Sequence, residues 1–566
     1  MPRDDATSID IASRLGRRTL VVPPGQRQRR LTDLLRTGDL PLNTRCGQRG
    51  LCDGCLVELH HGRLRHHETG ELITANGQAV TVPACQYMLT ADNATRLRLP
   101  DRSLLAYRPQ VVDEFRLTAS TGHNPLGPPT ATATLGAAVD VGTTTVAALL
   151  VDLATGAILA RASAFNRQMH LGDDVLTRIE LCGSRPGSLA ELQRQVVTHT
   201  FMPLLVELLG GAARRPEELA CVAIAGNTTM LHLFAGVDPT PMGVLPFTPA
   251  FLEHRQLDAA DLSPVAQGTP ELAPQLHLLP GAAAYIGADL TAGVVATNML
   301  YAAETSLLVD VGTNGEIILK HGDQLFACAT AAGPAFEGAR LSCGMRAGDG
   351  AISHIRFGEH ARDVDIEVVG GSRVKPAGLC GSAYLDLLAE ARRVDLLTAA
   401  GRFMPEHAGE RLIHDKHLGR CFQVARGQGK RAIVVSECDI AALLQAKAAI
   451  AAGILTLLRH ADLEPTDIRT LHLAGGFGMH IDVANAIAVG LLPGFRSEQV
   501  RVVGNTALAG AYLALLDRGL IDEMARVADR LRIIELNQDP AFESHFIDAL
   551  ALPAVRQESP GIIPLP

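Results

Sequence analysis

Residues 135–160 have the sequence LGAAVDVGTTTVAALLVDLATGAILA, and this stretch predicts the fold of most of the chain. One apolar run ends at Asp140, a short polar turn follows, and a second apolar run begins, which predicts two strands joined by a hairpin. The turn holds Gly142 and three threonines, Thr143, Thr144 and Thr145, whose amide and hydroxyl groups can cradle a phosphate. One such turn by itself is also compatible with a hairpin that binds nothing.

The same pattern returns at residues 307–319, LLVDVGTNGEIIL, where Asp310 ends the first strand. The turn and the start of the next strand supply Gly312, Thr313, Asn314, Gly315 and Glu316. Two hairpins of this kind can hold a nucleotide from both sides of a cleft. The repetition therefore favours a phosphate site over an empty turn.

A third element, LHLAGGFGMH at residues 471–480, runs from a predicted strand into Gly475, Gly476 and Gly478. Without side chains at these positions, a nucleoside can lie directly against the backbone. The chain contains neither the P-loop pattern nor the G-x-G-x-x-G pattern, which disfavours P-loop and dinucleotide-binding folds. In this order the three elements resemble the phosphate 1, phosphate 2 and adenosine motifs of the actin-like superfamily, which includes sugar kinases and heat-shock ATPases.

That resemblance implies actin-like (ribonuclease H-like) ATPase domains that bind ATP together with Mg²⁺. Hard oxygen ligands suit Mg²⁺, so Asp140 and Asp310 are expected to hold it through waters. Asp310 and Glu316 are the candidate catalytic residues, with Glu316 orienting the attacking water; a structural salt bridge is the alternative role for Glu316. Gly333 and Gly338, in GPAFEG, are expected to shape the cleft near the phosphates.

Four of the eleven cysteines are grouped, as Cys46-x5-Cys52-x2-Cys55 followed by Cys85. Three thiolates on one loop and a distant fourth are typical of ferredoxins with a [2Fe–2S] cluster, whose plant-type spacing is C-x4-C-x2-C…C. The x5 spacing resembles the adrenodoxin-like branch. A zinc site would usually need a second CxxC pair. The other seven cysteines are expected to be packing residues: Cys182, Cys221, Cys328, Cys343, Cys380, Cys421 and Cys438.

The flanks of the cysteine loop predict a β-grasp fold. RTLVVPP (18–24) is expected to form the first strand, residues 31–36 a short helix, and CLVEL (55–59) a strand that leaves the loop. VTVPACQ then delivers Cys85, and RLRLP is the closing strand. The histidine-rich segment HHGRLRHH (60–67) is expected to be a solvated loop rather than a metal site.

Charge and composition divide the chain of 566 residues. Its net charge is −9, yet residues 1–100 carry 14 Arg, no Lys and 10 acidic residues, a net of +4. This split favours a small module joined to a larger acidic body, with chance variation as the alternative. We predict a [2Fe–2S] ferredoxin-like domain at 1–100, a Pro/Gly-rich linker at 101–134, a middle domain at 135–210 and a C-terminal ATPase domain at 211–566.

Composition also excludes several classes of protein. Aromatic residues make up 4% of the chain and Trp is absent, which argues against single-stranded nucleic-acid binding. No stretch approaches about 20 uninterrupted apolar residues, and the N-terminus has no secretory signal pattern. The sequence therefore predicts a cytoplasmic protein without nucleic-acid or membrane partners.

The resemblance narrows with five further stretches. They are AIAGNTTMLHLFAGVDPTPMGVLPFTPAF (223–251), ATAAGPAFEGARLSCGMRAGDGAI (329–352), GLCGS (378–382), LQAKAAIAAG (444–453) and VGNTALAGA (503–511). Together with the earlier motifs, from residue 18 to about 540, they resemble the reductive activators of corrinoid enzymes. The C-terminal tail contains no cysteine, so the chain resembles the N-terminal [2Fe–2S] branch of that family.

The resemblance implies an ATP-dependent enzyme that passes an electron from its cluster to inactive Co(II) in a corrinoid protein of a methyltransferase system, regenerating Co(I). It also implies a homodimer. No flavin or nicotinamide domain is fused to the chain, so the electron must come from an external ferredoxin, flavodoxin or reductase.

Two other functions remain open on the sequence alone: a small-molecule kinase of the same superfamily, and a redox sensor whose nucleotide cleft controls assembly. Kinases have no evident use for a [2Fe–2S] module. The activators of hydroxyacyl-CoA dehydratases share the ATPase fold but hold a [4Fe–4S] cluster between subunits and lack the ferredoxin domain.

The cysteine spacing leads to a first prediction: the purified protein carries about two irons and two acid-labile sulfides per chain. Metal and sulfide analysis, with EPR after mild reduction, would test this. A rhombic S = 1/2 signal is expected, whereas stoichiometric zinc without iron would exclude the cluster.

Overall fold

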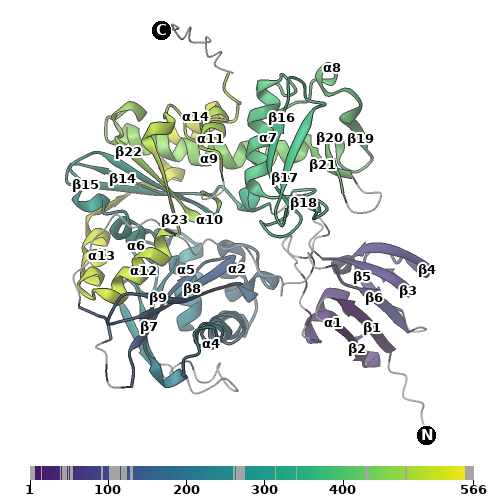
Figure 1. Cartoon of the computed structure of the whole chain (residues 1–566), viewed down its shortest axis with the longest axis horizontal. Coiled ribbons are helices and arrows are strands. Elements are labelled where there is room, and N and C mark those ends of the chain that lie inside the picture. The colour runs from purple at the N-terminus through teal and green to yellow at the C-terminus, as the bar shows by residue number, and fades with distance from the viewer. Residues whose placement is uncertain are drawn as a thin grey trace.

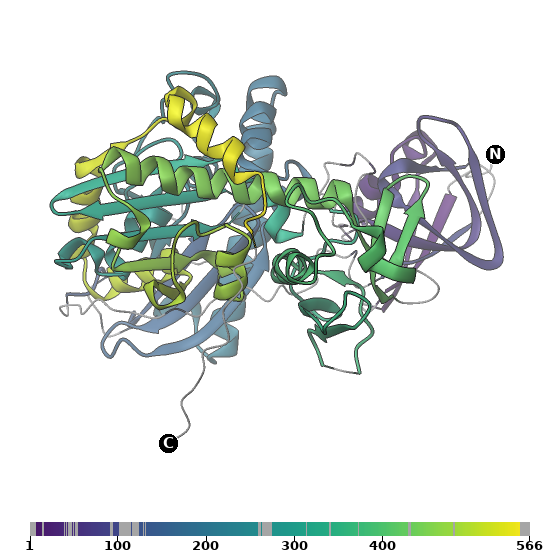
Figure 2. The ribbon, with the colours of Figure 1, turned by 90° about the horizontal axis from the view of Figure 1, so that it is seen from above.

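The computed structural model describes most of the chain (Figures 1 and 2). The described residues are 7–13, 16–38, 40, 42, 48, 50, 55–90, 94–100, 103, 115, 124–127, 130, 132–258, 262, 274–312, 314–338, 341–371, 373–427, 432–478 and 481–554.

The N-terminal part is a mixed sheet with the strand order β2-β1-β6-β3-β4, in which β5 also pairs with β3. Strands β1 and β6 are parallel and the other pairs antiparallel, which is the topology of a β-grasp sheet. Helix α1 buries Leu31, Leu34 and Leu35 in its core. The elements are β1 (Thr7–Ser13), β2 (Gly16–Val22), α1 (Leu31–Thr37), β3 (Leu56–His66), β4 (Leu72–Pro83), β5 (Tyr87–Leu89) and β6 (Thr95–Arg98).

Two local predictions for this part are wrong. The strand around Leu20 is the second strand, because β1 precedes it and pairs with it. Most of HHGRLRHH lies in β3 instead of a loop, where residues 61–65 pair with β4. Only Gly62 and Leu64 of that stretch are buried, so its apolar alternation was too weak to indicate a strand.

A second sheet forms the first lobe, with the order β11-β12-β10-β7-β8-β9. Helices α2 to α5 connect or cover these strands, and α6 follows them. The elements are β7 (Leu135–Val141), β8 (Thr145–Asp152), β9 (Ile158–Phe165), α2 (Val175–Ser184), α3 (Ser188–Val196), α4 (Met202–Gly211), β10 (Leu219–Ala225), α5 (Thr228–Ala235), β11 (Arg255–Asp258), β12 (Gln275–Leu278) and α6 (Ala288–Ala296).

A third sheet forms the second lobe, with the order β23-β22-β13-β14-β15-β24. Its elements are β13 (Ser306–Val311), β14 (Gly315–His321), β15 (Gln324–Thr330), α9 (Glu437–His460), β22 (Thr470–Ala474), α10 (Gly475–Gly478), α11 (Val483–Ala488), β23 (Val500–Gly504), α12 (Thr506–Leu516), α13 (Gly519–Arg530), β24 (Leu531–Ile533) and α14 (Pro540–Ala549).

An insert between β15 and α9 carries two small three-stranded sheets, ordered β17-β16-β18 and β19-β20-β21. Its elements are β16 (Ala351–Phe357), β17 (Val364–Val368), β18 (Gly378–Leu379), α7 (Gly381–Arg393), α8 (Pro405–Ala408), β19 (Leu412–Asp415), β20 (Gly419–Arg426) and β21 (Ala432–Ser436).

The two lobes repeat one topology. In each, the first strand (β7 or β13) pairs antiparallel with the next strand of its hairpin and parallel with a later strand, β10 or β22. This duplication is the actin-like ATPase arrangement. Because β10 to β12 share a sheet with β7, no division falls between residues 210 and 211 as predicted; we place it after α6.

Helices α6 and α12 cross between the lobes (Figure 1). A Cβ atom at Gly510 in α12 would lie 2.5 Å from the carbonyl oxygen of Ala292 in α6, so only glycine allows this approach. Gly293 is similarly close to Thr506, at 2.9 Å from its hydroxyl oxygen. Glycines thus fix the distance between the two lobes.

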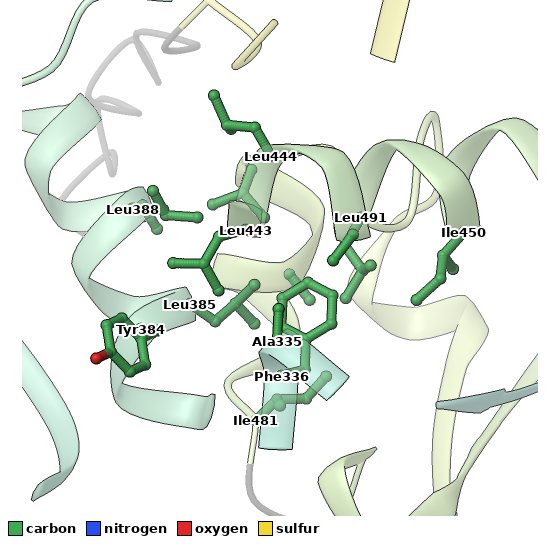
Figure 3. Packing of buried hydrophobic residues seen from close by; sticks show 14 of the residues in the cluster. Ala335, Phe336, Tyr384, Leu385, Leu388, Leu443, Leu444, Ile450, Ile481 and Leu491 are labelled. Atoms are coloured by element: carbon green, nitrogen blue, oxygen red, sulfur yellow. The ribbon is translucent and has the colours of Figure 1, made fainter. Parts of the chain in front are cut away.

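Helix α9 is the central helix of the largest core. By length and composition it could cross a membrane, but 78% of its apolar window is buried within the protein. Figure 3 shows Leu443 of α9 beside Leu385 and Leu388 of α7, with Phe336 nearby. The helix therefore joins the insert to the second lobe through apolar packing.

The helix crossing leads to a second prediction. Gly510→Ala should lower the free energy of unfolding by about 1–3 kcal/mol, because the added methyl group overlaps the α6 backbone. Urea denaturation followed by far-UV circular dichroism measures this. Gly210→Ala, in α4 with open space around it, is the control and should be neutral or slightly stabilising. Equal stabilities of the two variants would contradict the close crossing.

Candidate functional site

The two central strands end close together between the lobes, and we call the region around these strand ends the cleft. Asp140 at the end of β7 accepts a 2.8 Å hydrogen bond from the side chain of Asn505, the residue that caps α12. Asp310, at the end of β13, lies against the glycine turn: a Cβ at Gly475 would be 2.5 Å from its Oδ1 atom. The structure therefore brings together the three predicted motifs.

The first hairpin turns its carbonyl groups into the first lobe. The carbonyl of Gly142 accepts from Asn166 Nδ2 at 2.9 Å, that of Thr143 from Arg178 Nη2 at 2.5 Å, and that of Thr144 from the Asn166 amide at 2.9 Å. Thr145 begins β8 and pairs with Phe165. With its acceptors engaged, this turn is suited to offer donors to an anion.

Arg178 places a positive charge directly beneath this hairpin. Its side chain is fully buried, and besides Thr143 it donates to the carbonyl of Gly172 at 2.9 Å and to Gln168 Oε1 at 2.8 Å. These hydrogen bonds hold the guanidinium, and with it the turn at Thr143, in a fixed position. The sequence analysis missed Arg178, because nothing near it in sequence marks it.

Two asparagines that the sequence analysis passed over reach into the cleft. Asn227 caps α5 and donates through Nδ2 to the Thr143 hydroxyl oxygen at 2.9 Å, while Asn505 caps α12 and bonds Asp140. Both stand in a Gly-Asn-Thr triplet between a strand and a helix, once in each lobe. The repeated triplet was the signal that could have identified them.

The second hairpin divides its residues between the cleft and the core. A Cβ at Gly312 would meet no atom closer than the Asn314 carbonyl oxygen, at 4.0 Å, and the Gly312 amide donates to that oxygen at 2.9 Å. A Cβ at Gly315 would lie 2.6 Å from the Thr330 hydroxyl oxygen, so this glycine is required for packing. Thr313 lies outside the described residues.

Four acidic side chains share the cleft, and burial raises the pKa of each. The pKa of Asp140 rises to about 6, that of Asp289 to about 7 and that of Asp310 to about 8, and the pKa of Glu316 lies well above its usual value. After burial, mutual repulsion contributes for the last three, while the Asn505 hydrogen bond opposes the shift at Asp140. Such a group favours the arrival of a cation.

Asp289, in the first turn of α6, was missed by the sequence analysis. Its amide approaches the carbonyl of Gly226 at 3.3 Å, and a Cβ at Gly287 would lie 2.6 Å from the Asn227 Cα. These contacts fix the start of α6 against the start of α5. Among the described residues, no three carboxylate, His or Cys side chains are placed to hold a metal directly.

The remaining predicted glycines differ in their surroundings. Gly333 (φ +73°) and Gly476 have open space, whereas a Cβ at Gly338 (φ +72°) would lie 2.6 Å from the Met345 carbonyl oxygen. At Gly478 the nearest atom, of Leu473, is 3.3 Å away. Gly338 therefore has a packing role in its turn.

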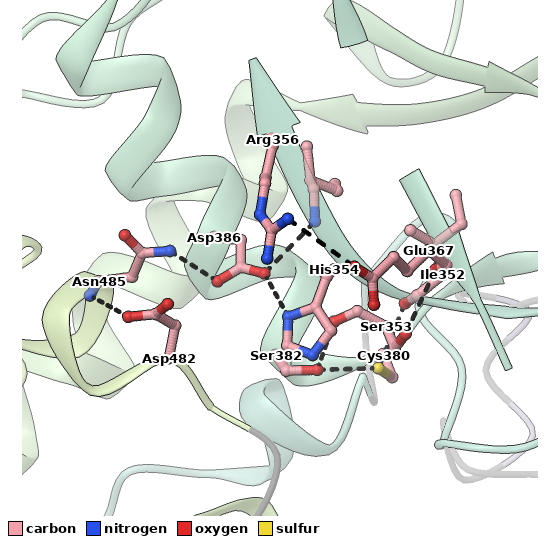
Figure 4. Close-up of polar contacts among 11 residues, drawn as sticks. Ile352, Ser353, His354, Arg356, Glu367, Cys380, Ser382, Asp386, Asp482 and Asn485 are labelled. Carbon is pink, nitrogen blue, oxygen red and sulfur yellow. Dashed lines mark hydrogen bonds and ion pairs between the residues drawn. The ribbon is translucent and has the colours of Figure 1, made fainter. Parts of the chain in front are cut away.

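A polar network connects the helix after the glycine turn with the insert (Figure 4). Asp386 of α7 accepts from Asn485 Nδ2 in α11 at 2.8 Å and lies 2.9 Å from the His354 Nδ1 atom in β16. Its buried carboxylate also accepts from the amide of Ile355 at 3.3 Å. A movement of the turn can thus reach the insert through α11.

At the N-terminal sheet, Cys55, just before β3, and Cys85, in the turn after β4, are both fully buried. The two segments are adjacent, since the Ala84 amide donates to the Cys55 carbonyl at 3.0 Å. Gln86 donates through Nε2 to the Cys85 sulfur at 3.4 Å and to the Gln48 carbonyl at 3.0 Å. A donor to sulfur and a close loop fit thiolate ligation of a cluster. Cys46 and Cys52 lie outside the described residues.

The duplicated lobes and the shared cleft define an actin-like, ASKHA-type ATPase fold. Residues 304–561 match the model for the C-terminal ASKHA domain of RACo, and residues 135–302 match the model for the RACo middle region. The chain belongs to the family of reductive activators of corrinoid proteins.

Three similar proteins carry names of this kind. The corrinoid activation enzyme RamQ of Eubacterium limosum is 32% identical over 72% of this chain and 68% of its own length. A [Co(II) methylated amine-specific corrinoid protein] reductase of Methanosarcina barkeri is 25% identical over 70% of this chain and 72% of its own. The solved structure of a reductive activator for a corrinoid, iron–sulfur protein is 29% identical, covers 96% of this chain and 98% of its own, and has a TM-score of 0.70.

The acidic cleft leads to a third prediction, for the protein without nucleotide and metal. The pKa of Asp310, about 8 when folded against 3.8 in a model compound, means that the folded state retains a proton that the unfolded state loses. Stability should therefore fall as pH rises from about 5 to 8. Asp310→Asn should flatten this dependence and be more stable at pH 8 by roughly 1–3 kcal/mol.

Urea denaturation at several pH values measures this effect. Asp365→Asn, on the exposed face of β17, removes the same charge outside the cleft and should retain the wild-type pH dependence. If the stability of Asp310→Asn depends on pH as strongly as that of the wild type, the pKa of Asp310 is not raised in the folded protein and the prediction is wrong.

Proposed function

We propose that this protein reactivates a corrinoid protein by passing one electron from a [2Fe–2S] cluster to Co(II), which becomes Co(I), in a reaction driven by ATP. The observation that carries the proposal is the convergence of both hairpins and the glycine turn on one acidic cleft, in a chain whose N-terminal sheet also buries Cys55 beside Cys85. Membership of the corrinoid activator family supports the corrinoid protein as the substrate.

Nucleotide binding would use both lobes. The donors of the hairpin at residues 142–144 would bind phosphate oxygens from one side, and the turn at Gly312 from the other. Gly475, Gly476 and Gly478 would lie along the nucleoside. Arg178 supports this direction of binding, because its hydrogen bond to the Thr143 carbonyl holds the first hairpin in place and leaves the donors of the turn available.

Mg²⁺ fits the cleft through its acidic side chains. Asp140, Asp289 and Asp310 would hold its water ligands, in keeping with the preference of Mg²⁺ for oxygen ligands and retained waters. Burial, and then repulsion from Asp289 and Asp310, raise the pKa of Glu316. Before Mg²⁺ binds, its carboxyl group would therefore be protonated; once the cation is bound, it would orient the attacking water. Bound Mg²⁺ would supply a Lewis acid for the phosphates.

Four cysteines would hold the cluster: Cys46, Cys52, Cys55 and Cys85. When bound, the cluster supplies one electron at a potential near the roughly −400 mV of plant-type ferredoxins. Gln86 would stabilise its ligand shell through the bond to the Cys85 sulfur. An external donor would then restore the electron, and we propose that the protein acts as a homodimer in the cytoplasm.

ATP would be required because Co(II) accepts an electron only at a lower potential. A nucleotide that bridges both hairpins would bind the closed conformation more tightly than the open one. The difference between these two binding free energies is the most that nucleotide binding can contribute to electron transfer. Asn505 at the start of α12 would transmit closure, since it bonds Asp140 across the lobes, while the Asp386 network would carry it to the insert.

The coupling leads to a fourth prediction. Reduced protein mixed with a Co(II)-corrinoid partner should yield substantial Co(I) only when hydrolysable ATP is present, because each 59 mV of potential costs about tenfold in a one-electron equilibrium. The Co(I) absorbance, measured anaerobically with a chemical reductant feeding the cluster, reports the yield.

Two variants separate the parts of this reaction. Asp310→Ala should abolish ATP turnover and retain the cluster spectrum, whereas Cys55→Ala should lose the cluster and still bind ATP. Both should form no Co(I) above background. Equal Co(I) yields with and without ATP in the wild type would refute the proposed coupling.

A further inference from the structure

The outward face of the N-terminal sheet carries a group of arginines. Alternation along β3 and β6 exposes Arg63, Arg65, Arg96 and Arg98 while burying Leu64 and Leu97. Arg17 on β2 joins them, because it and Arg98 both lie opposite Ala12 of β1. We call these five residues the arginine face: Arg17, Arg63, Arg65, Arg96 and Arg98.

Few negative charges oppose the arginine face. Glu58 pairs with Arg98 at 3.2 Å, and Asp10 accepts a 2.8 Å hydrogen bond from the Thr19 hydroxyl. The adjoining strand β4 carries no charged residue along its whole length. The face therefore has a clear excess of positive charge, although the whole chain has a net charge of −9.

The arginine face also lies on the accessible side of the sheet. Helix α1 covers the other side, which is the side nearer the first lobe in Figure 1. Arg36 of α1 lies close enough to α3 to act on Glu191 there. Burial raises the pKa of Glu191, but a hydrogen bond from Gln195 and the charges of Arg194, His170 and Arg36 lower it overall. A partner can thus reach the arginine face without displacing the ATPase lobes.

The face begins near the cysteines. Leu56, which directly follows Cys55, starts β3 opposite Pro83 of β4, and Glu58 lies beside Arg98 two residues further on. At about 3.3 Å per residue, this arginine is roughly 7 Å along the strand from the cysteine end of the sheet. A protein docked here would be close to the cluster ligands.

We propose that the arginine face docks an acidic electron-carrier protein, which delivers to the cluster the electron that is later passed to cobalt. This inference rests on the proposed function, since it requires the cluster. In the docked complex the carrier is oxidised by one electron and the cluster is reduced by one electron. Complementary charge mainly accelerates such encounters, and it does so most at low ionic strength.

The face favours an acidic protein over a nucleic acid. Single-stranded nucleic acids need aromatic side chains on which bases stack, and Tyr87 is the one aromatic residue among residues 1–100, where it is buried. The remaining alternative partner is an anionic membrane surface, and the experiment has to distinguish it from an acidic protein.

The test uses the full-length protein and an acidic flavodoxin in its fully reduced form. Anaerobic stopped-flow absorbance follows cluster reduction at several salt concentrations. In Arg63→Glu/Arg96→Glu, the second-order rate constant at low salt should fall about tenfold or more and lose most of its salt dependence. Arg63→Gln/Arg96→Gln should show a smaller fall in the same direction, which guards against misfolding of the charge-reversed variant.

Arg215→Glu/Arg469→Glu is the matched control, with the same change of charge on the two lobes, where these side chains are 75% and 80% exposed. It should retain the wild-type rate. Dithionite should reduce the cluster in all variants; if the wild type shows no reducible cluster, both the proposed function and this inference fail.

If dithionite reduces the cluster but charge reversal leaves the flavodoxin rate unchanged, the docking inference alone is refuted. Co-sedimentation with vesicles of anionic phospholipid tests whether the arginine face binds a membrane instead. A variant that loses vesicle binding while it keeps the flavodoxin rate would assign the arginine face to a membrane and overturn the proposal.

Discussion

The crossing of α6 and α12 is the contact on which the rest of the structure depends. The absence of a side chain at Gly510 lets the two helices approach to backbone contact at Ala292. Both helices begin near Asp140, which bonds Asn505 at the start of α12 and whose charge helps to raise the pKa of Asp289, after burial, at the start of α6. The close approach of these two helices therefore sets the distance between the lobes at this point.

The acidic side chains of the cleft repel one another when they are ionised, and a bound cation would reduce this repulsion. Four acidic groups share it; burial raises the pKa of each, and repulsion between them adds to the shift at Asp289, Asp310 and Glu316. In the proposed function a cation would relieve this repulsion, and a nucleotide phosphate would then meet the donors of the first hairpin, which Arg178 holds through the Thr143 carbonyl. Energy spent on assembling like charges during folding is thereby recovered on binding.

In the proposed function the electron and the nucleotide would be handled in separate parts of the chain. The N-terminal sheet has its own core, formed by residues that include Leu59 and Leu97, whereas the lobes and the insert are joined through α9 and through the Asp386 network. This separation allows one face of the sheet to receive a carrier while the opposite face, with α1, remains directed toward the lobes. Nucleotide binding to the lobes would then leave the proposed cluster ligands in the N-terminal sheet undisturbed.

The sequence by itself determined the local features: both hairpins, the glycine turn, the cysteine group and most strands of the N-terminal sheet. Each depends on a local pattern of apolar residues, glycines or cysteines, which can be recognised in the sequence without knowledge of the tertiary structure. Tertiary structure decided how Asn505 bonds Asp140, 365 residues away, and which glycines serve packing, as Gly315 and Gly338 do. It also decided that β10 to β12 complete the first lobe, that Asp289 joins the acidic group, and that Arg178 lies beneath a hairpin. These features arise from contacts between distant segments, and such contacts leave no periodic trace in the sequence because only the folded chain brings the partners together.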